Sequence, residues 1–348
     1  MKKFILNTSF YIVPFFILHA FNVFNYKQRG AEGDLARVGY LYSNPLPRGI
    51  IKSQYNLPIQ FTLLSEINLT NKVKIDVVTI GDSFSEQDSL GYKNFLGNNG
   101  TSVLHVDRSI SGNNPIQALV GLINSNLFDS VQTDYIVLQS SVRDINNRTK
   151  SIDFENSIDF ELLLKKVNNN RTEVPNYNFQ FFSDATIKMP LNNFQYLFSS
   201  KPFFSKTYKI KSNNPNLFSN NPDNILFYKD DIQKLNTKND SLKTLNSIKV
   251  LNDISNILSR KNIKLIVIVS PDKYDMYYPY IENKSDFIEP TFFSTYERAD
   301  KKYENVDTYR ILSKGIATEK DVYFYDDTHW SPKGAKIVAD ELYDIIYK

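Results

Sequence analysis

VKIDVVTIG, residues 73–81, is a run of β-branched residues that ends in a glycine. This composition over so short a length is typical of a buried β-strand. Three more runs of the same kind follow along the chain: SVLHV at 102–106, DYIVLQ at 134–139 and KLIVIVSP at 264–271. We therefore predict that these runs form buried strands of one sheet.

Helix-like stretches lie between the strand-like runs. The alternation of strand and helix predicts a parallel sheet that helices cover on both faces. The end of the chain adds the clearest unit, because VYFYDD at 322–327 is predicted to be a fifth strand and Ser331 to cap a helix whose first position is Pro332. The expected fold is thus a three-layer α/β/α domain with a five-stranded parallel sheet.

The N-terminal residues 4–24 carry no formal charge, and their length matches the roughly 20 residues that a membrane helix requires. We interpret residues 1–25 as a membrane anchor, with a cleaved signal peptide as the alternative. A buried N-terminal helix of a soluble protein is a further alternative. On the first two interpretations the rest of the chain is exported, and Lys2 and Lys3 favour a cytoplasmic N-terminus.

The remaining chain divides into a lead-in and a domain. Residues 26–72 contain turn signals and scattered apolar residues, which indicates a tether with little regular structure. The domain is predicted to span residues 73–348. Within it, residues 145–240 are rich in Asn, Ser, Lys and Phe without sustained periodicity, and we interpret them as an insertion. Insertions of this kind often shape or cover a binding site.

Composition and charge narrow the classes of function. The 348 residues have a net charge of +3 and no run of five or more Lys or Arg residues, so no nucleic-acid partner is expected. Cysteine is absent, which removes disulfides, thiol nucleophiles and thiolate metal sites. The three histidines form no cluster with metal-ligand spacing, so we expect no metal and no other cofactor.

TIGDSFSE, residues 79–86, places Ser83 directly after the first predicted strand. In a parallel sheet, ligands bind beyond the carboxyl ends of the strands, and a serine at a strand-to-helix turn presents its hydroxyl there. Ser83 therefore occupies the position of a nucleophile. The alternative is that Asp82 or Ser83 only caps the following helix.

A serine nucleophile requires a base, usually a histidine that a carboxylate orients. Of the three histidines, one lies in the membrane segment, and His105 lies within the second predicted strand, where a packed imidazole is the simpler interpretation. His329 follows the fifth predicted strand, with Asp326 and Asp327 just before it. If both strand ends open at one edge of the sheet, His329 meets the serine there. The alternative is that His329 starts a helix without a catalytic partner.

GDSFS at 81–85 together with DTHWSPKGA at 327–335 resembles the SGNH (GDSL) hydrolase superfamily, and more closely its branch of SGNH-like domains in alginate and other cell-envelope polysaccharide O-acetyltransferases. The resemblance covers residues 73–144 and 241–348 and implies a flavodoxin-like fold with a five-stranded parallel sheet. It implies that Ser83 is the nucleophile, His329 the general base and Asp327 the carboxylate that orients it. The pattern of the wider superfamily would instead place that acid at Asp326.

The chain departs from the superfamily after the third predicted strand. A GxND element usually follows that strand, and its Asn helps to hold the oxyanion, but this chain has LQSSVRDI at 138–145. The tetrahedral intermediate of acyl transfer still requires hydrogen-bond donors. The candidates are the backbone N–H groups of Ser83 and Gly112, the Asn113 side chain, and Arg143. The alternative for Arg143 is a surface ion pair.

Three further residues are placed at the rim of the predicted site. Trp330, the only tryptophan, is expected either to stack on a sugar ring or to seal the last helix against the sheet. Lys273 and Tyr274 follow the fourth predicted strand. Their position alone suggests contact with a glycan or an acetyl donor.

The predicted function is serine-dependent transfer of an acetyl group to an exported cell-envelope or extracellular polysaccharide through an acetyl-serine intermediate. The resemblance implies a multi-spanning membrane partner that supplies acetyl groups, and a bacterial protein that is anchored in the membrane and faces the periplasm or cell exterior. The alternatives are a carbohydrate or lipid esterase of the same fold, and a catalytically silent glycan-binding scaffold.

Overall fold

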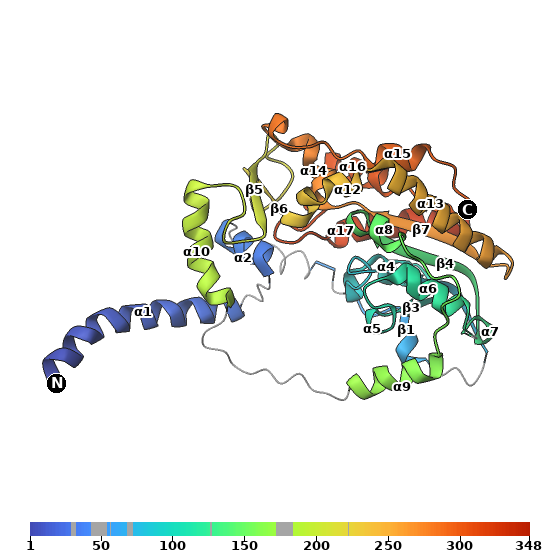
Figure 1. The fold of residues 1–348 in the computed structure, drawn as a ribbon, viewed down its shortest axis with the longest axis horizontal. Coiled ribbons are helices and arrows are strands. Elements are labelled where there is room, and N and C mark those ends of the chain that lie inside the picture. The colour runs from blue at the N-terminus through green and yellow to red at the C-terminus, as the bar shows by residue number, and fades with distance from the viewer. Residues whose placement is uncertain are drawn as a thin grey trace.

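A parallel sheet forms the centre of the structure, which is a computed structural model (Figure 1). Its six strands lie in the order β1-β3-β2-β4-β7-β8, and each neighbouring pair is parallel. Helices cover both faces of the sheet, which confirms the predicted α/β class. The structure describes residues 1–28, 33–42, 54–55, 57–67, 72–125, 127–171, 184–221 and 223–348.

The four central strands coincide with the four strand-like runs of the sequence. Residues 77–80 of β2, 103–106 of β3, 136–141 of β4 and 265–270 of β7 are buried on both faces, which explains why these parts of the strands are mostly apolar instead of alternating. The prediction of five strands is wrong, because the sheet has six and both edge strands are very short. The strands are β1 (Thr62–Leu63), β2 (Val73–Ile80), β3 (Val103–Val106), β4 (Val131–Ser141), β7 (Lys264–Ser270) and β8 (Glu304–Val306).

Residues 322–327 do not form the fifth strand that the sequence indicates. The segment belongs to a loop that turns back on itself, in which one isolated bridge joins Tyr323 to Trp330 and the Ser331 N–H donates to the Val322 carbonyl at 2.9 Å. The aromatic side chains of this loop are buried in the core. Burial, rather than pairing in the sheet, accounts for the strand-like composition of the stretch.

The two faces of the sheet have separate apolar cores, to which alternate strand residues contribute. Val77 of β2 belongs to the first core and its neighbour Val78 to the second. The first core is completed by α4 (Tyr92–Asn98), α16 (Thr308–Thr318) and α17 (Pro332–Tyr347). The second is completed by α6 (Pro115–Ile123), α8 (Val142–Arg148), α13 (Ser241–Ser259) and α15 (Phe292–Arg298).

Helix α17 begins as the sequence predicts. The Ser331 hydroxyl accepts a hydrogen bond from the Lys333 N–H at 3.1 Å, and Pro332 takes the first helical position. The apolar residues that recur at helical spacing are all buried. The cap and the buried face hold α17 against the sheet from its first turn. The chain directly after His329 is therefore fixed in place.

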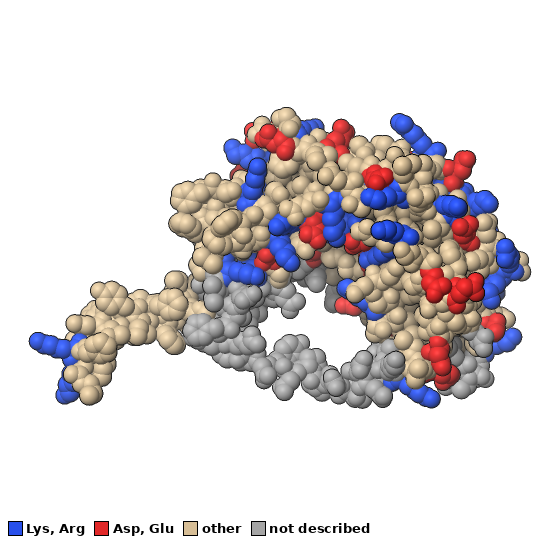
Figure 2. Space-filling model, in the orientation of Figure 1, with Lys and Arg blue, Asp and Glu red and all other residues tan. Residues whose placement is uncertain are grey.

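An apolar helix, α1 (Lys2–Gln28), projects away from the sheet domain (Figures 1 and 2). Among the described residues, Lys2–Phe21 is the one stretch that is long and apolar enough to cross a membrane, with a mean hydropathy of 1.7. Figure 2 shows basic side chains at the free end of α1. These properties fit a membrane anchor or a signal segment, as the sequence suggests.

A small lobe beside the sheet combines two distant parts of the sequence (Figure 1). It consists of α2 (Gly33–Tyr42), α10 (Asp184–Phe198) and an antiparallel pair, β5 (Thr207–Lys211) and β6 (Asn224–Tyr228). Helix α2 comes from the stretch interpreted as a tether, and the rest from the stretch interpreted as an insertion. Helix α2 contacts the other three elements, and its Asp34 accepts a hydrogen bond from the Lys206 N–H at 2.7 Å.

Short elements complete the described chain. They are η1 (Leu64–Glu66), η2 (Asp88–Leu90), α5 (Arg108–Ser111), α7 (Leu127–Ser130), α9 (Phe160–Arg171), α11 (Lys229–Gln233), α12 (Leu235–Lys238), α14 (Lys273–Tyr277), η3 (Tyr278–Tyr280) and η4 (Lys284–Asp286). Helices α11, α12 and α14 lie near one another and carry charged residues that bear on the site described next.

Candidate active site

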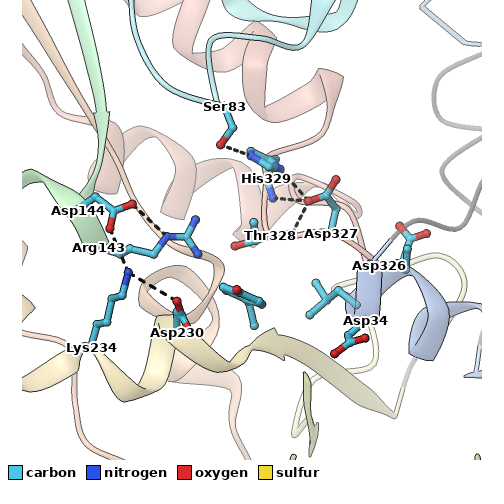
Figure 3. A pocket seen from close by; sticks show the side chains of 14 residues that line it. Asp34, Ser83, Arg143, Asp144, Asp230, Lys234, Asp326, Asp327, Thr328 and His329 are labelled. Atoms are coloured by element: carbon cyan, nitrogen blue, oxygen red, sulfur yellow. Dashed lines mark hydrogen bonds and ion pairs between the residues drawn. The ribbon is translucent and has the colours of Figure 1, made fainter. Parts of the chain in front are cut away.

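Ser83, His329 and Asp327 form one continuous hydrogen-bonded chain (Figure 3). The Ser83 Oγ lies 2.7 Å from His329 Nε2, and His329 Nδ1 lies 2.7 Å from Asp327 Oδ1. Both distances are typical of well-formed hydrogen bonds. The three side chains therefore stand in the order that nucleophile, base and orienting acid take in serine-dependent acyl transfer.

The turn after β2 holds Ser83 in place. Gly81 is required there, because a Cβ at that position would lie only 2.1 Å from Ser85 Oγ. Asp82 accepts hydrogen bonds from the Phe84 N–H at 3.1 Å and the Ser141 N–H at 2.8 Å. The helix-cap alternative is wrong for Ser83, whose hydroxyl is bonded to His329, whereas Asp82 does anchor the turn.

Asp82 is buried and pairs with Arg148 of α8. Burial alone would raise the pKa of Asp82, but the Arg148 ion pair and the hydrogen bond from Ser141 lower it below its ordinary value. The carboxylate is therefore charged at neutral pH. It ties the nucleophile turn to β4, the neighbour of β2 in the sheet, and to α8.

The loop that carries His329 distinguishes the two candidate acids. Asp327 Oδ1 accepts a hydrogen bond from the His329 ring and another from the Thr328 N–H at 2.6 Å. Asp326 is buried, and its Cβ lies against the backbone of Gly39 in α2. In Figure 3 the Asp326 carboxylate lies away from the imidazole, so the favoured acid is the bonded carboxylate of Asp327.

Lys273 supports this loop from inside the protein. Its ammonium donates hydrogen bonds to the carbonyl oxygens of Phe324 at 2.7 Å and Tyr325 at 2.6 Å, and lies 3.4 Å from the Asp327 carbonyl oxygen. Burial lowers the pKa of Lys273 to about 7, although Asp326 and other carboxylates act in the opposite direction. Lys273 thus binds the backbone of the loop that holds the base.

The proposed glycan contacts of Trp330, Lys273 and Tyr274 are wrong, because all three side chains are fully buried. Trp330 packs edge-on against Phe84 at 4.8 Å between ring centroids, so it seals α17 against the sheet. The Tyr274 hydroxyl donates to the Ile288 carbonyl at 2.8 Å. A position at the end of a strand did not reveal that these side chains turn inward.

Arg143 is neither a surface ion pair nor an unpaired cation. Its side chain is 10% exposed and pairs with Asp231, with Asp272 at 3.5 Å and with Asp144 at 3.9 Å. Burial would lower the pKa of Arg143, but these carboxylates raise it. Arg143 therefore stays charged and is held in the wall of the cavity that Ser83 also lines (Figure 3).

Asp231 is a site residue that the sequence did not reveal. It lies in α11, is fully buried, and accepts a hydrogen bond from the Thr328 hydroxyl at 3.2 Å next to His329. Burial raises the pKa of Asp231 to about 7, against the lowering effect of Arg143. Its only signal in the sequence is an acidic pair in a segment of low periodicity, which many solvent-exposed stretches share.

The two candidates after β3 are already engaged elsewhere. The Gly112 N–H donates to the Arg108 carbonyl at 2.9 Å, and the Asn113 side chain accepts from Arg108 at 3.2 Å. Neither residue lines the cavities at Ser83. The structure therefore does not bring Gly112 and Asn113 to the candidate site. The Ser83 N–H makes no hydrogen bond within the described part of the chain, so it is still available to an oxyanion.

His105 is a packed imidazole, as the sequence suggests. It is completely buried, with one ring nitrogen 2.9 Å from Thr79 Oγ1 and the other 3.1 Å from Glu86 Oε1. Burial lowers the pKa of His105, although Glu86 opposes this effect. The ring is therefore neutral at pH 7.

Two cavities meet at Ser83, Asp327 and His329. The first, here called the α2 cavity, has a volume of about 400 Å³ and is also lined by the start of α2, Arg143, Tyr228 and Lys234. The second, here called the Glu86 cavity, has a volume of about 500 Å³ and is also lined by Tyr55, Phe324 and residues 86–90. Among the described residues, no group of three His, Cys, Asp or Glu side chains is arranged to hold a metal ion.

Comparison with known proteins gives one match. Residues 222–348 match the family model described as SGNH hydrolase-like domain, acetyltransferase AlgX. Searches of curated proteins and of solved structures found no match. The family match confirms the resemblance for a segment that contains His329 and Asp327, and it indicates acetyl-ester hydrolysis or transfer. Ser83 lies outside the matched residues and is joined to them by its hydrogen bond to the base.

Proposed function

We propose that this protein, with an SGNH hydrolase-like acetyltransferase segment at residues 222–348, transfers acetyl groups to hydroxyls of an exported polysaccharide through an acetyl-Ser83 intermediate. One observation carries the proposal. The Ser83 Oγ and His329 Nε2 lie 2.7 Å apart although they come from opposite ends of the sheet domain in sequence. A structural serine has no need of an imidazole that is itself bonded to a carboxylate.

In the first half of the proposed reaction, His329 Nε2 takes the Ser83 proton while Oγ attacks the acetyl carbonyl carbon. Asp327 stabilises the imidazolium that forms. The tetrahedral intermediate collapses, the donor oxygen leaves with the proton from His329, and an acetyl ester remains on Ser83. In the second half a sugar hydroxyl replaces the donor, and the same proton steps run in reverse. Water in place of the sugar makes the reaction an esterase reaction.

Two donors support the oxyanion in this proposal. One is the Ser83 N–H. The other is Arg143, whose guanidinium carries five N–H donors and whose ion pairs use Nε and Nη1. Arg143 and Ser83 line the same cavity. Arg143 would thus replace the Asn that the superfamily usually supplies.

Membrane attachment is part of the proposal. Helix α1 contains the stretch that can cross a membrane, and only residues 29–32 separate it from α2, which lines the α2 cavity. The proposed site therefore lies close to the membrane surface on the periplasmic or outer side. That position suits a multi-spanning membrane partner that supplies acetyl groups.

The first test uses the full-length chain in detergent with 4-nitrophenyl acetate. Ser83→Ala should lower nitrophenolate release by at least about 10³-fold, because the nucleophile is lost. Ser259→Ala, an exposed serine on α13, is the matched control and should behave as wild type. Mass spectrometry of the quenched wild-type protein should find one acetyl group on the peptide that contains Ser83. Equal rates for wild type and Ser83→Ala would exclude the proposal.

A second measurement separates transfer from hydrolysis. Oligosaccharides are added to the same reaction, and acetylated sugar is measured by mass spectrometry. Acetylated sugar that depends on Ser83 supports transfer. Free acetate alone, across neutral, amino and acidic oligosaccharides, would favour the esterase alternative.

A further inference from the structure

Ser83 is reached from two sides. The α2 cavity and the Glu86 cavity share Ser83, Asp327 and His329, and both volumes fall within the roughly 300–1,000 Å³ of small-molecule sites. A hydrolase needs one substrate site, because its second reactant is water. Two cavities at one serine provide separate places for a donor and for an acceptor.

The α2 cavity lies on the side of the membrane anchor. Its wall includes Asp34 near the start of α2, which the short segment 29–32 connects to α1. The cations in this wall are already paired: Lys234 lies 3.2 Å from Asp144, and Arg143 is held by three carboxylates. This is the side from which a donor at the membrane would arrive.

The Glu86 cavity has a different chemistry. Its described wall contains the carboxylates of Glu86 and Asp88, the neutral hydrogen-bonding groups of Gln87 and Ser89, and the half-buried ring of Tyr55. No Lys or Arg is among the described lining residues. Carboxylates accept hydrogen bonds and sugar hydroxyls donate them, while an aromatic ring covers the apolar face of a sugar.

Groups behind this wall do not cancel its negative charge. His105 contacts Glu86 but is neutral at pH 7, because burial lowers its pKa. Lys93 keeps most of its charge at pH 7, since burial lowers its pKa only to about 8, but its ammonium is directed at the Ser85 carbonyl and over the Phe61 ring and does not line the cavity, so one cation behind the wall faces the two carboxylates in it. The surface that a ligand meets therefore remains acidic.

We infer that the Glu86 cavity is the acceptor subsite and that it takes a sugar that carries no carboxylate. The inference rests on the proposed function and narrows its substrate class. A uronate would bring its charge against Glu86 and Asp88 in a partly enclosed space, where like charges repel more strongly than in water. A neutral or amino sugar instead donates hydrogen bonds to the same oxygens.

The transfer step in this cavity balances without a further reactant. His329 Nε2 takes the proton of the acceptor hydroxyl, and the sugar oxygen attacks the acetyl carbon of acetyl-Ser83. The bond between the acetyl carbon and Ser83 Oγ breaks. The proton passes from His329 to Oγ, so that the serine hydroxyl and an O-acetyl sugar are the products.

The test measures binding and transfer separately. Ser83→Ala, as the full chain in detergent, is titrated by calorimetry with tetrasaccharides of glucose, galactose and mannose and with their uronate counterparts. Neutral tetramers should bind at least about tenfold more tightly than the matched uronates. In the wild type, transfer from 4-nitrophenyl acetate should show the same order. Binding is measured without any reaction, so failure of the transferase proposal does not affect it.

Variants that remove one negative charge from the wall of the Glu86 cavity test which residues cause the preference for neutral sugars. Asp88→Asn should reduce the preference for neutral sugars about threefold or more, and Asn tolerates the left-handed φ of 46° at this position. Glu86→Gln, which keeps a hydrogen-bonding group for His105, should also reduce the preference for neutral sugars. Asp253→Asn, an exposed site on α13, is the control and should leave the preference unchanged.

Three results would overturn the inference. They are tighter binding of the uronates, no binding of any tetramer in the panel, and a preference that neither Asp88→Asn nor Glu86→Gln changes. Loss of Ser83 dependence in the transfer assay would instead remove the proposed function. The two failures are therefore distinguishable.

Discussion

Two neighbouring aspartates illustrate how closely the site depends on single residues. Asp327 bonds the His329 ring at 2.7 Å, whereas Asp326 turns away and packs against Gly39 of α2. Both lie on one loop, and from the sequence either could be the acid that orients His329. The difference is a matter of side-chain direction within the turn that carries both residues.

Asp327→Asn should lower the kcat for 4-nitrophenyl acetate by about 10²- to 10⁴-fold, because the amide cannot stabilise the imidazolium and favours the wrong tautomer. The unfolding midpoint in urea should stay within the range of ordinary surface variants. Asp326→Asn, measured in parallel, should lose much less activity. A larger loss for Asp326→Asn would reassign the acid.

Lys273→Met should reduce both stability and activity. The variant keeps the length of the side chain but leaves the Phe324 and Tyr325 carbonyls without their donor, at a cost of about 1–3 kcal/mol for each buried group. The loop that carries His329 then loses its support. Thermal unfolding and nitrophenolate release measure the two effects, and Lys336→Met, at an exposed ion pair, is the control. Full activity in Lys273→Met would show that the loop needs no such support.

Among the elements, the turn after β2 depends on one buried ion pair. The folded pKa of Asp82 is below its ordinary value, so this group contributes stability that is fully present above the unfolded pKa of about 3.9. That contribution is lost as the pH falls through the lower folded pKa. Acid should therefore weaken the tie between the Ser83 turn and Arg148 of α8.

Asp82→Asn should cost about 3 kcal/mol at pH 7, since it removes the closer of the two carboxylates that pair with the mostly buried Arg148, the other being Asp144 at 3.8 Å. The stability difference from wild type should narrow below about pH 4, where the wild-type carboxylate also loses its charge. Urea unfolding of both proteins across this pH range measures the difference. An equal difference at pH 7 and in acid would indicate that the charge of Asp82 does not matter.

Helix α2 forms a wall of the site only because it carries a glycine where it meets the loop. A Cβ at Gly39 would lie 2.4 Å from the Asp326 Cβ, so Gly39→Ala must push the loop and α2 apart. We expect nitrophenolate release to fall about tenfold or more, because the base is displaced from Ser83. Gly91→Ala, whose added carbon would lie 3.4 Å from the Gln87 Cβ, is the control. Wild-type activity in Gly39→Ala would mean that α2 can move without affecting the base.

At the scale of the whole molecule, the sequence patterns identified the strands that are buried on both faces of the sheet. The central strands could be recognised because both faces are apolar, but the two- and three-residue edge strands β1 and β8 carry no pattern that differs from a loop. The prediction of a strand at residues 322–327 failed because this stretch has a strand-like composition without belonging to the sheet. Their aromatic composition reflects packing around a loop, and composition alone does not separate a packed loop from a strand.

The sequence predicted those site residues that lie in recognisable motifs. Ser83, Asp327 and His329 each stand in a short motif after a strand-like run. Asp231 and the inward direction of Lys273 depend on contacts between segments far apart in the chain, such as the hydrogen bond from Thr328 to α11. No local periodicity encodes such a contact, so only the three-dimensional structure reveals it.

Deletion of residues 2–21 should move the protein from the membrane fraction to the soluble fraction after cell lysis, because it removes the stretch of mean hydropathy 1.7. Nitrophenolate release should stay within about threefold of the full-length rate, since those residues do not line either cavity. Sedimentation followed by the assay measures both. A deleted protein that stays with the membranes would show that another part of the chain binds them.

The bond between Ser83 and His329 also has a consequence during biosynthesis. The nucleophile is made early, whereas its base belongs to the final loop before α17. A polypeptide of which only the first part has been made therefore holds the Ser83 hydroxyl without the imidazole. If the proposed function holds, acyl transfer can begin only once the His329 loop has been made and α17 has docked against the sheet.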